Sequence, residues 1–128
     1  MTEKKDYERE SYVLLEKTRA LYSILQPKLV LFPKDGKTEL KKTIEESVIK
    51  CIKFLIAKNY RETTEEKRKL LLEYLGEINF IKILLKQCVI FKYISYGNYD
   101  DISNLMGELL AMASSEYKNL EGKNENLQ

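Results

Sequence analysis

Apolar residues recur every three or four positions through most of this 128-residue chain, and that spacing places them on one face of a helix. The pattern is clearest over residues 38–60, where the apolar stripe consists of Leu40, Ile44, Val48, Cys51, Ile52 and Leu55. No segment shows the alternation of apolar and polar residues that is typical of a half-buried strand. The chain is therefore predicted to be all-α.

Glycine and proline are rare, and several of them help to locate the ends of the predicted helices. A first helix is predicted over residues 8–31, and Pro27 inside it should remove one backbone hydrogen bond and bend the helix. Its apolar positions are Tyr12, Leu15, Leu21, Tyr22, Leu25 and Leu29. The segment FPKDGK, residues 32–37, then turns the chain into the helix over residues 38–60.

Capping signals bound a third helix. Thr63 and Glu66 match a capping box, which predicts a helix that begins at residue 64. The helical pattern continues to about residue 95. Gly97 is expected to end this helix in the left-handed conformation that favours glycine.

The fourth helix is expected to begin at a cap formed by Asp100 or Asp101. Its apolar positions are Ile102, Leu105, Met106, Leu109, Leu110, Met112 and Ala113. Helices joined by short turns pack as antiparallel neighbours, so we predict an up-down-up-down four-helix bundle. A single domain should cover residues 1–120, and the polar residues 121–128 should form a frayed tail.

The chain contains no histidine, which is the commonest acid–base group and the commonest metal ligand. The Glu-x-x-His di-iron sites of some helical bundles are therefore excluded, and no Gly-rich phosphate loop is present. Cys51 and Cys88 are too few and too far apart for a disulfide framework or a zinc site, so we expect two buried thiols. These features predict a protein that is not an enzyme and that has no cofactor and no metal.

Composition sets only broad limits on compartment and partner. No apolar run is long enough to cross a bilayer, and the charged start MTEKKDYERE leads into no signal-peptide core. We therefore expect a cytoplasmic protein without a membrane partner. The net charge of +2 does not by itself indicate nucleic-acid binding, so the distribution of the charges matters more.

The third helix has more apolar residues than one core face needs. Residues that can line the core are Leu71, Tyr74, Leu75, Ile78, Ile81, Leu85 and Cys88. Phe80, Leu84 and Phe91 fall on another side, and a helix that is apolar on more than one side is buried on more than one side. These three residues predict an oligomer interface. The alternative is a thick monomer core that the first helix partly covers.

Lysines gather toward one end of the predicted bundle. Lys82, Lys86 and Lys92 lie between Glu77 and Asp100, in a stretch without acidic residues. The antiparallel arrangement brings to the same end Lys28, Lys34, Lys37, Lys41 and Lys42. Nearby tyrosines are Tyr93, Tyr96 and Tyr99. Such a cluster is either a solvated helix face or a surface whose lysines neutralise phosphates while tyrosines stack on bases.

The other end of the predicted bundle carries charges of both signs. Its charged residues are Lys58, Arg61, Glu62, Glu65, Glu66, Lys67, Arg68, Lys69 and Glu73. Alternating charges of this kind pair on helix surfaces, where each exposed pair contributes about 0.3–0.5 kcal/mol. This end is therefore expected to be an ordinary solvated surface.

Three stretches resemble a known protein family. They are a Phe-Pro-basic step at Phe32-Pro33-Lys34, the segment INFIKILLKQC at residues 78–88, and the segment NLMGELLAMASSEY at residues 104–117. The family pattern for the second stretch is Leu-x-x-Leu-Arg-x-Leu-Leu-Arg-x-Ala. Over about residues 11–118 the chain resembles the Avd proteins, the accessory variability determinants of diversity-generating retroelements. Related four-helix-bundle proteins are encoded by intervening sequences in bacterial 23S ribosomal RNA genes.

The resemblance implies a homopentameric barrel with a basic surface. It also implies a non-catalytic accessory that binds a reverse transcriptase and nucleic acid, either template RNA or cDNA, during mutagenic retrohoming. Lys82 and Lys86 stand at the positions of two family arginines, and lysine neutralises phosphate without the planar fork of arginine. The turn KDGKTEL also lacks the arginine and aromatic residues that are usual in the family.

Other functions stay open at the level of sequence. An intervening-sequence protein would share the barrel and have no polymerase partner. A helical interaction module, such as an adaptor or a toxin-system component, would not need its lysine cluster. An enzyme would have to act without histidine.

Overall fold

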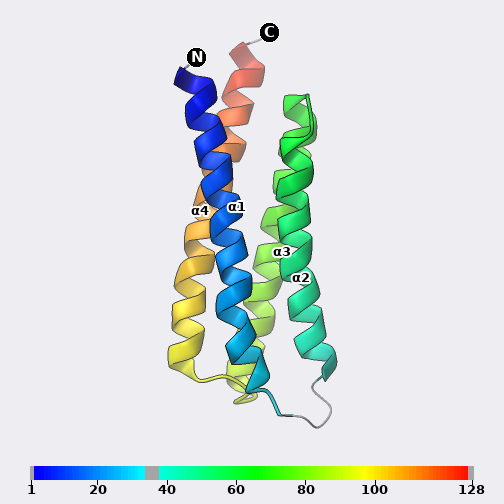
Figure 1. Ribbon diagram of the computed structural model, residues 1–128, viewed down its shortest axis with the longest axis vertical. Helices are drawn as coiled ribbons and strands as arrows, with labels where there is room; N and C mark the ends of the chain where they lie inside the picture. Colours follow the sequence, from blue (N-terminus) through cyan, green and yellow to red (C-terminus); the bar gives the residue numbers. More distant parts are fainter. Residues whose placement is uncertain (1, 34–37, 127–128) are drawn as a thin grey trace.

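The computed structural model describes residues 2–33 and 38–126, which form four long helices (Figure 1). The helices are α1 (Thr2–Val30), α2 (Thr38–Asn59), α3 (Thr64–Ile90) and α4 (Tyr96–Asn126). Within these two ranges no residue belongs to a strand. The prediction of an all-helical fold with four helices is therefore confirmed.

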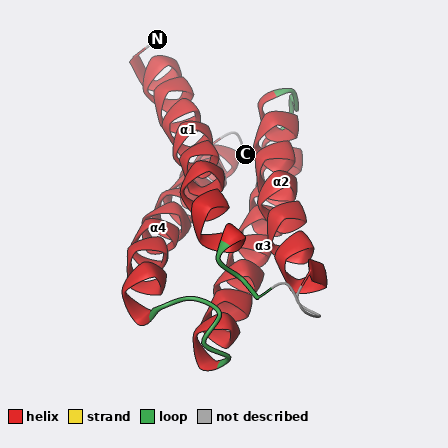
Figure 2. Cartoon of the chain, turned by 60° about the horizontal axis from the view of Figure 1, so that its bottom comes forward, coloured by secondary structure: helices red, strands yellow, loops and turns green. Residues whose placement is uncertain are grey.

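Each helix packs against its neighbours in the chain, and α1 also packs against α4. α1 ends and α2 begins at the same end of the bundle at which α3 ends and α4 begins (Figures 1 and 2). The α2–α3 turn lies at the opposite end, together with the start of α1 and the end of α4. Successive helices therefore run in opposite directions, as the short connections predict.

Core residues follow the spacing of three and four on every helix. The buried apolar residues of α2 are Ile44, Val48, Cys51 and Leu55, and those of α4 are Ile102, Met106, Leu109, Ala113 and Leu120. Leu40 and Ile52, also predicted for the α2 stripe, are partly buried against this core. Burial of such faces, rather than intrinsic helix propensity, provides most of the stability of helices in proteins.

The core face of α1 differs from the predicted one. Tyr12 is 62% exposed, and Leu15 is only partly buried. The buried face instead passes through Ser11, Leu14 and Thr18 before it continues along the predicted leucines. Two of these three residues are polar, so apolar spacing alone does not reveal this part of the face.

The outer ends of α1 and α4 reach further than predicted. α1 begins at Thr2 rather than near residue 8, and it continues through Pro27 to Val30. α4 reaches Asn126 and therefore passes the predicted domain boundary at residue 120. Leu120 is buried, and the side chain of Glu121 after it is exposed.

The start of α3 agrees with the sequence, but its end does not. α3 ends at Ile90 rather than near residue 95, and Lys92 has a φ of 64°. The backbone N–H of Tyr93 donates to the carbonyl of Cys88 at 2.8 Å, and that of Lys92 donates to the carbonyl three residues before it at 2.9 Å. These bonds form a Schellman motif with Lys92 in the left-handed position. The prediction that Gly97 ends α3 is wrong.

α4 begins at Tyr96, about one and a half turns earlier than predicted. The side-chain oxygen of Ser95 accepts a hydrogen bond from the backbone N–H of Asn98 at 3.1 Å, which makes Ser95 the cap. Asp100 and Asp101 lie inside the helix, so the predicted cap is wrong. Serine and aspartate cap helices about equally well, and the sequence offers all three residues within one and a half turns.

Candidate binding surface on α3

The side of α3 that points away from the core carries several exposed apolar residues, with the exposed polar residue Asn79 among them. Leu72, Ile83 and Ile90 follow one another at intervals of eleven and seven residues, which is about three and two turns at roughly 3.6 residues per turn. Their side chains are 52%, 67% and 63% exposed, respectively. Gly76 lies one turn after Leu72 on the same side, and a Cβ added there would meet no atom within 4 Å. We call these four residues the outer face of α3.

The buried residues of α3 lie on the opposite side. They are Leu71, Tyr74, Ile78, Ile81, Leu85 and Cys88. Among the described residues, the backbone of α1 lies beside those of α2 and α4, and α1 reaches α3 on its core side, through the hydrogen bond between Thr18 and Tyr74. The first helix therefore does not cover the surplus apolar residues of α3, and the outer face is open in the single chain.

The residues predicted for an oligomer interface lie along one edge of the outer face. Phe80 and Phe91 are 42% and 50% exposed. Leu84 is partly buried and packs against the core. The spacing of four and seven residues keeps the three side chains on one side of the helix.

Sequence interpretation did not single out the most exposed members of this surface. Ile83 stands two residues from the buried residues Ile81 and Leu85 on either side, about half a helical turn. Ile90 has the same relation to Cys88. This offset of two from a core position is the signal that could have identified the outer face.

Lys82 and Lys86 lie along the other edge of the outer face. Lys86 is exposed and Lys82 is partly exposed. Neither lysine forms an ion pair with an acidic side chain in the part of the chain that the structure describes. Two like charges thus stand beside an apolar stripe at the surface, and neither is buried in the core.

Further lysines of the predicted cluster lie at the same end of the bundle. Lys28 belongs to the last turn of α1, Lys41 to the first turn of α2, and Lys92 to the turn after α3. Lys92 is exposed, and the other two are partly exposed. Figure 2 shows this end of the bundle coming forward, where α1 ends, α2 begins and α3 ends.

The remaining predicted lysines add less to this cluster. Lys42 is exposed and lies 4.0 Å from Glu46, which is a weak surface pair. Lys34 and Lys37 lie outside the described residues.

Only part of the predicted tyrosine set is available for stacking. The ring of Tyr93 packs against Phe32 and Phe91 at centroid distances of 5.7 and 5.4 Å. Tyr96 is 72% exposed, and its ring centroid lies 6.3 Å from that of the half-buried Tyr99. Tyr93 therefore closes the end of the core, whereas Tyr96 presents its ring to solvent.

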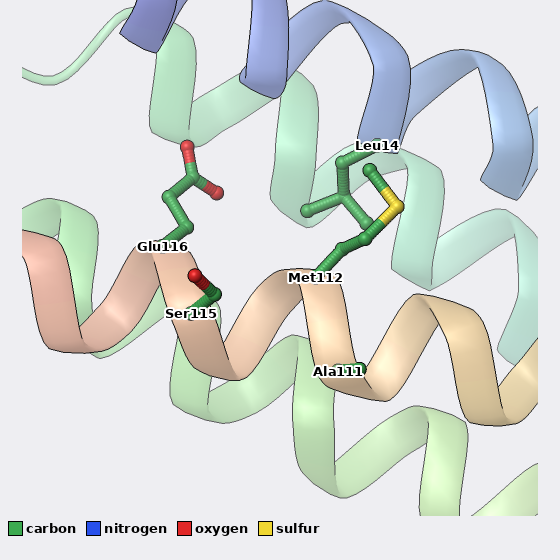
Figure 3. Close-up of a pocket in the computed structure, with 5 residues that line it drawn as sticks. All are labelled: Leu14, Ala111, Met112, Ser115 and Glu116. Atoms are coloured by element: carbon green, nitrogen blue, oxygen red, sulfur yellow. The ribbon is translucent and has the colours of Figure 1, made fainter.

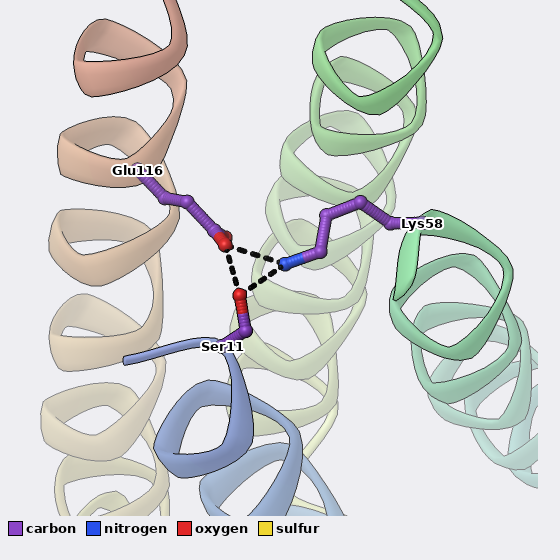
Figure 4. Close-up of polar contacts among 3 residues, drawn as sticks. All are labelled: Ser11, Lys58 and Glu116. Atoms are coloured by element: carbon purple, nitrogen blue, oxygen red, sulfur yellow. Dashed lines mark hydrogen bonds and ion pairs between the residues drawn. The ribbon is translucent and has the colours of Figure 1, made fainter. Parts of the chain in front are cut away.

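A buried polar cluster lies in the other half of the bundle, formed by Ser11 of α1, Lys58 of α2 and Glu116 of α4 (Figure 4). Lys58 Nζ donates to Glu116 Oε1 at 2.6 Å and to Ser11 Oγ at 3.1 Å. Ser11 Oγ donates to the same carboxylate oxygen at 2.5 Å. We call these three residues the Lys58–Glu116 cluster.

The prediction that Lys58 belongs to a solvated surface is wrong, because its side chain is only 1% exposed. Burial lowers the pKa of Lys58, and the neighbouring Glu116 carboxylate opposes this effect. The two residues are far apart in sequence, so local charge patterns give no sign of their contact.

Both cysteines are buried, as predicted. Burial raises the pKa of both thiols, that of Cys88 to about 11, so both stay protonated at neutral pH. A protonated thiol is a poor nucleophile and a poor metal ligand. The described residues contain no group of three or more acidic or cysteine side chains that could hold a metal ion.

No helix within the described ranges is long and apolar enough to cross a membrane. Comparison of the chain with family models, with curated proteins and with solved structures gives no match.

Proposed function

We propose that this protein is a non-catalytic accessory of the Avd type. It assembles with copies of itself through the outer face of α3. The assembly binds nucleic acid, template RNA or cDNA, with the lysines at the edge of that face, and it does so together with a reverse transcriptase.

The observation that carries the proposal is the combination of features on α3. Leu72, Ile83 and Ile90 are exposed on a helix whose opposite side is buried. Exposed apolar surface is unfavourable by roughly 25 cal/mol per Å², and contiguous apolar patches mark interaction sites. A second chain that covered this face would bury the stripe and place lysines from both chains along its rim.

The lysines supply the second half of the argument. Lys82 and Lys86 are adjacent on the helix, and no described acidic side chain neutralises them. Phosphate neutralisation requires positive charge rather than the bidentate geometry of arginine. Symmetry would repeat the pair in every subunit, so an assembly would present a larger basic surface than one chain does.

Binding to a structured RNA and to a DNA duplex across a salt series tests this function. Log affinity should fall linearly with log salt concentration, because each neutralised phosphate releases counterions. The variant Lys82→Ala/Lys86→Ala should bind at least tenfold more weakly at low salt and show a shallower slope. The variant Lys50→Ala/Lys118→Ala loses the same charge from exposed positions on α2 and α4, and it should bind almost as the native protein does.

Absence of binding at low salt by the folded native protein would contradict nucleic-acid binding. An equal loss of affinity in both variants would contradict a role of Lys82 and Lys86 at the edge of α3.

The polymerase part of the proposal has its own test. A gene for a reverse transcriptase and a template repeat should lie beside the gene for this protein, and the two proteins should co-purify. Without that neighbourhood, an intervening-sequence protein or an interaction module becomes the better description.

A further inference from the structure

The connection between α3 and α4 exposes a tyrosine ring at the end of the bundle that comes forward in Figure 2. Tyr96, the first residue of α4, is 72% exposed. Its ring centroid lies 6.3 Å from that of Tyr99, with the two planes tilted by 46°, and Tyr99 packs against the core. Tyr99 therefore supports the Tyr96 ring at the surface, and most of that ring is open to a ligand.

Lys92 stands in the same connection, at a position where glycine would be more stable. Its φ of 64° lies in the left-handed region, in which a Cβ is unfavourable. The lysine side chain is exposed, and it forms no ion pair with a described acidic residue. Strained residues are concentrated at functional sites, so the strain at Lys92 indicates that its ammonium group serves binding.

We infer that Tyr96 and Lys92 form a site for single-stranded nucleic acid, with an unpaired base stacked on the Tyr96 ring and a nearby phosphate at Lys92. The inference rests on the proposed function, and it specifies the form of nucleic acid that this site takes. In a duplex the faces of the bases are covered by neighbouring bases, so an exposed aromatic ring stacks on unpaired bases. Proteins that bind single strands combine such rings with basic residues along the backbone.

Asp100 limits the orientation of the strand. It is exposed and lies four residues after Tyr96, on the same side of α4. Its carboxylate repels phosphates, but it can accept a hydrogen bond from the amino group of a base. The base is therefore expected on the side of Asp100, and the phosphates are expected on the side of Lys92.

The pocket between α1 and α4 does not offer an alternative site for the base (Figure 3). The described residues that line it are Leu14, Ala111, Met112, Ser115 and Glu116, and none of these five is basic or aromatic. A phosphate there would meet the carboxylate of Glu116 and no positive charge from the lining. The stacked base is therefore assigned to the connection between α3 and α4.

Fluorescence anisotropy with a labelled DNA strand of about 20 nucleotides, and with its duplex, tests this inference. Tyr96→Leu should weaken binding of the single strand at least fivefold. It should leave binding of the duplex unchanged, because the α3 lysines of the proposed function act on the phosphates of both forms. Tyr96→Phe keeps the ring and should bind as the native protein does. Tyr60→Leu makes the same change at an 83% exposed tyrosine at the opposite end of the bundle and should have no effect.

Lys92→Gly separates binding from folding. It removes the ammonium group and relieves the backbone strain, so it should raise the midpoint of thermal unfolding and yet weaken binding of the single strand at least threefold. The slope of log affinity against log salt concentration should become shallower by about 0.7, the value for one phosphate contact on a single strand. Unchanged affinity and slope would overturn the role of Lys92.

Three outcomes would overturn the role of Tyr96 and leave the proposed function intact. They are unchanged binding of the single strand by Tyr96→Leu, an equal loss for the single strand and the duplex in that variant, and an equal loss in Tyr60→Leu. A native protein that binds neither form would contradict the proposed function itself, and the inference with it.

Discussion

At the scale of single residues, Lys58 is the clearest departure from what the sequence indicates. A lysine near the end of a helix, among residues of both signs, has every feature of a surface residue. Its ammonium group is nevertheless buried because Glu116 and Ser11 converge on it from two other helices. Only the tertiary fold brings these groups together, so no local pattern could have predicted the cluster.

Removal of one partner from the Lys58–Glu116 cluster should destabilise the protein strongly. Lys58→Met leaves the Glu116 carboxylate buried with only Ser11 as a donor, and we expect a loss of about 3–5 kcal/mol in the free energy of unfolding. The double variant Lys58→Met/Glu116→Leu removes both charges and should recover most of that loss. Urea denaturation of the native protein, both single variants and the double variant measures this coupling; additive losses would contradict it.

Lys92 offers the opposite kind of substitution, one that should stabilise the protein. Its φ of 64° lies in the left-handed region, which is unfavourable for a residue with a Cβ by about 1–2 kcal/mol. Lys92→Gly should therefore raise the free energy of unfolding by about 1 kcal/mol. Lys92→Ala removes the same charge but keeps the Cβ, so thermal unfolding of this control should show no such gain.

At the scale of helices, prediction succeeded where apolar spacing alone decides the outcome. The predicted stripe of α2 contains all four buried apolar residues of that helix, Ile44, Val48, Cys51 and Leu55, although the polar residue Ser47 is buried beside them. The face of α1 was partly missed because Ser11 and Thr18 share it. Thr18 is satisfied inside the core by a hydrogen bond of 2.8 Å with the hydroxyl group of Tyr74, a contact that the sequence does not signal.

The ends of helices were harder to predict, because several residues can serve each one. Lys92 rather than Gly97 takes the left-handed position after α3, and Ser95 rather than an aspartate caps α4. Glycine has the better propensity for the left-handed position, whereas serine and aspartate cap helices about equally well, so propensity alone could not identify either end.

The cap of α4 can be tested directly. Ser95→Ala removes the acceptor for the backbone N–H of Asn98 and should lower the free energy of unfolding by about 1 kcal/mol. Asp100→Ala and Asp101→Ala, as controls, should each change it by no more than about 0.5 kcal/mol, because both residues are exposed inside the helix. A larger effect at either aspartate would place the cap where the sequence had suggested.

At the scale of the whole molecule, the two halves of the bundle differ in character. One half buries the ion pair of Lys58 with Glu116, whereas the other half presents Lys82 and Lys86, which pair with no described acidic side chain, beside exposed apolar residues of α3. The sequence predicted the surplus of apolar residues on α3 and the lysine pair. It did not identify Leu72, Ile83 and Ile90 as exposed. Apolar residues on a helix are expected in the core, and only the packing of the bundle shows which side of the helix is buried.

Assembly through the outer face of α3 is the central claim, and it implies that one chain exposes surface meant for another. Interfaces of stable complexes bury about 800 Å² per partner, with apolar residues at the centre and charged residues at the rim. Ile83 lies between Lys82 and Lys86 on one side and Phe80 and Phe91 on the other, so an apolar residue is flanked by charged residues as in such interfaces. A charged residue in place of Ile83 should therefore prevent association without disturbing the core.

The most direct measurement is the mass in solution of the native protein and of Ile83→Glu, determined by light scattering at micromolar concentration. The native protein should have a multiple of the 15.1 kDa of one chain, about five times that value for an Avd-type barrel. Ile83→Glu should have the mass of a single chain, and Ile24→Glu, at a partly exposed position of α1, should keep the native mass. A native protein that stays monomeric, or an Ile83→Glu variant that still assembles, would contradict the account.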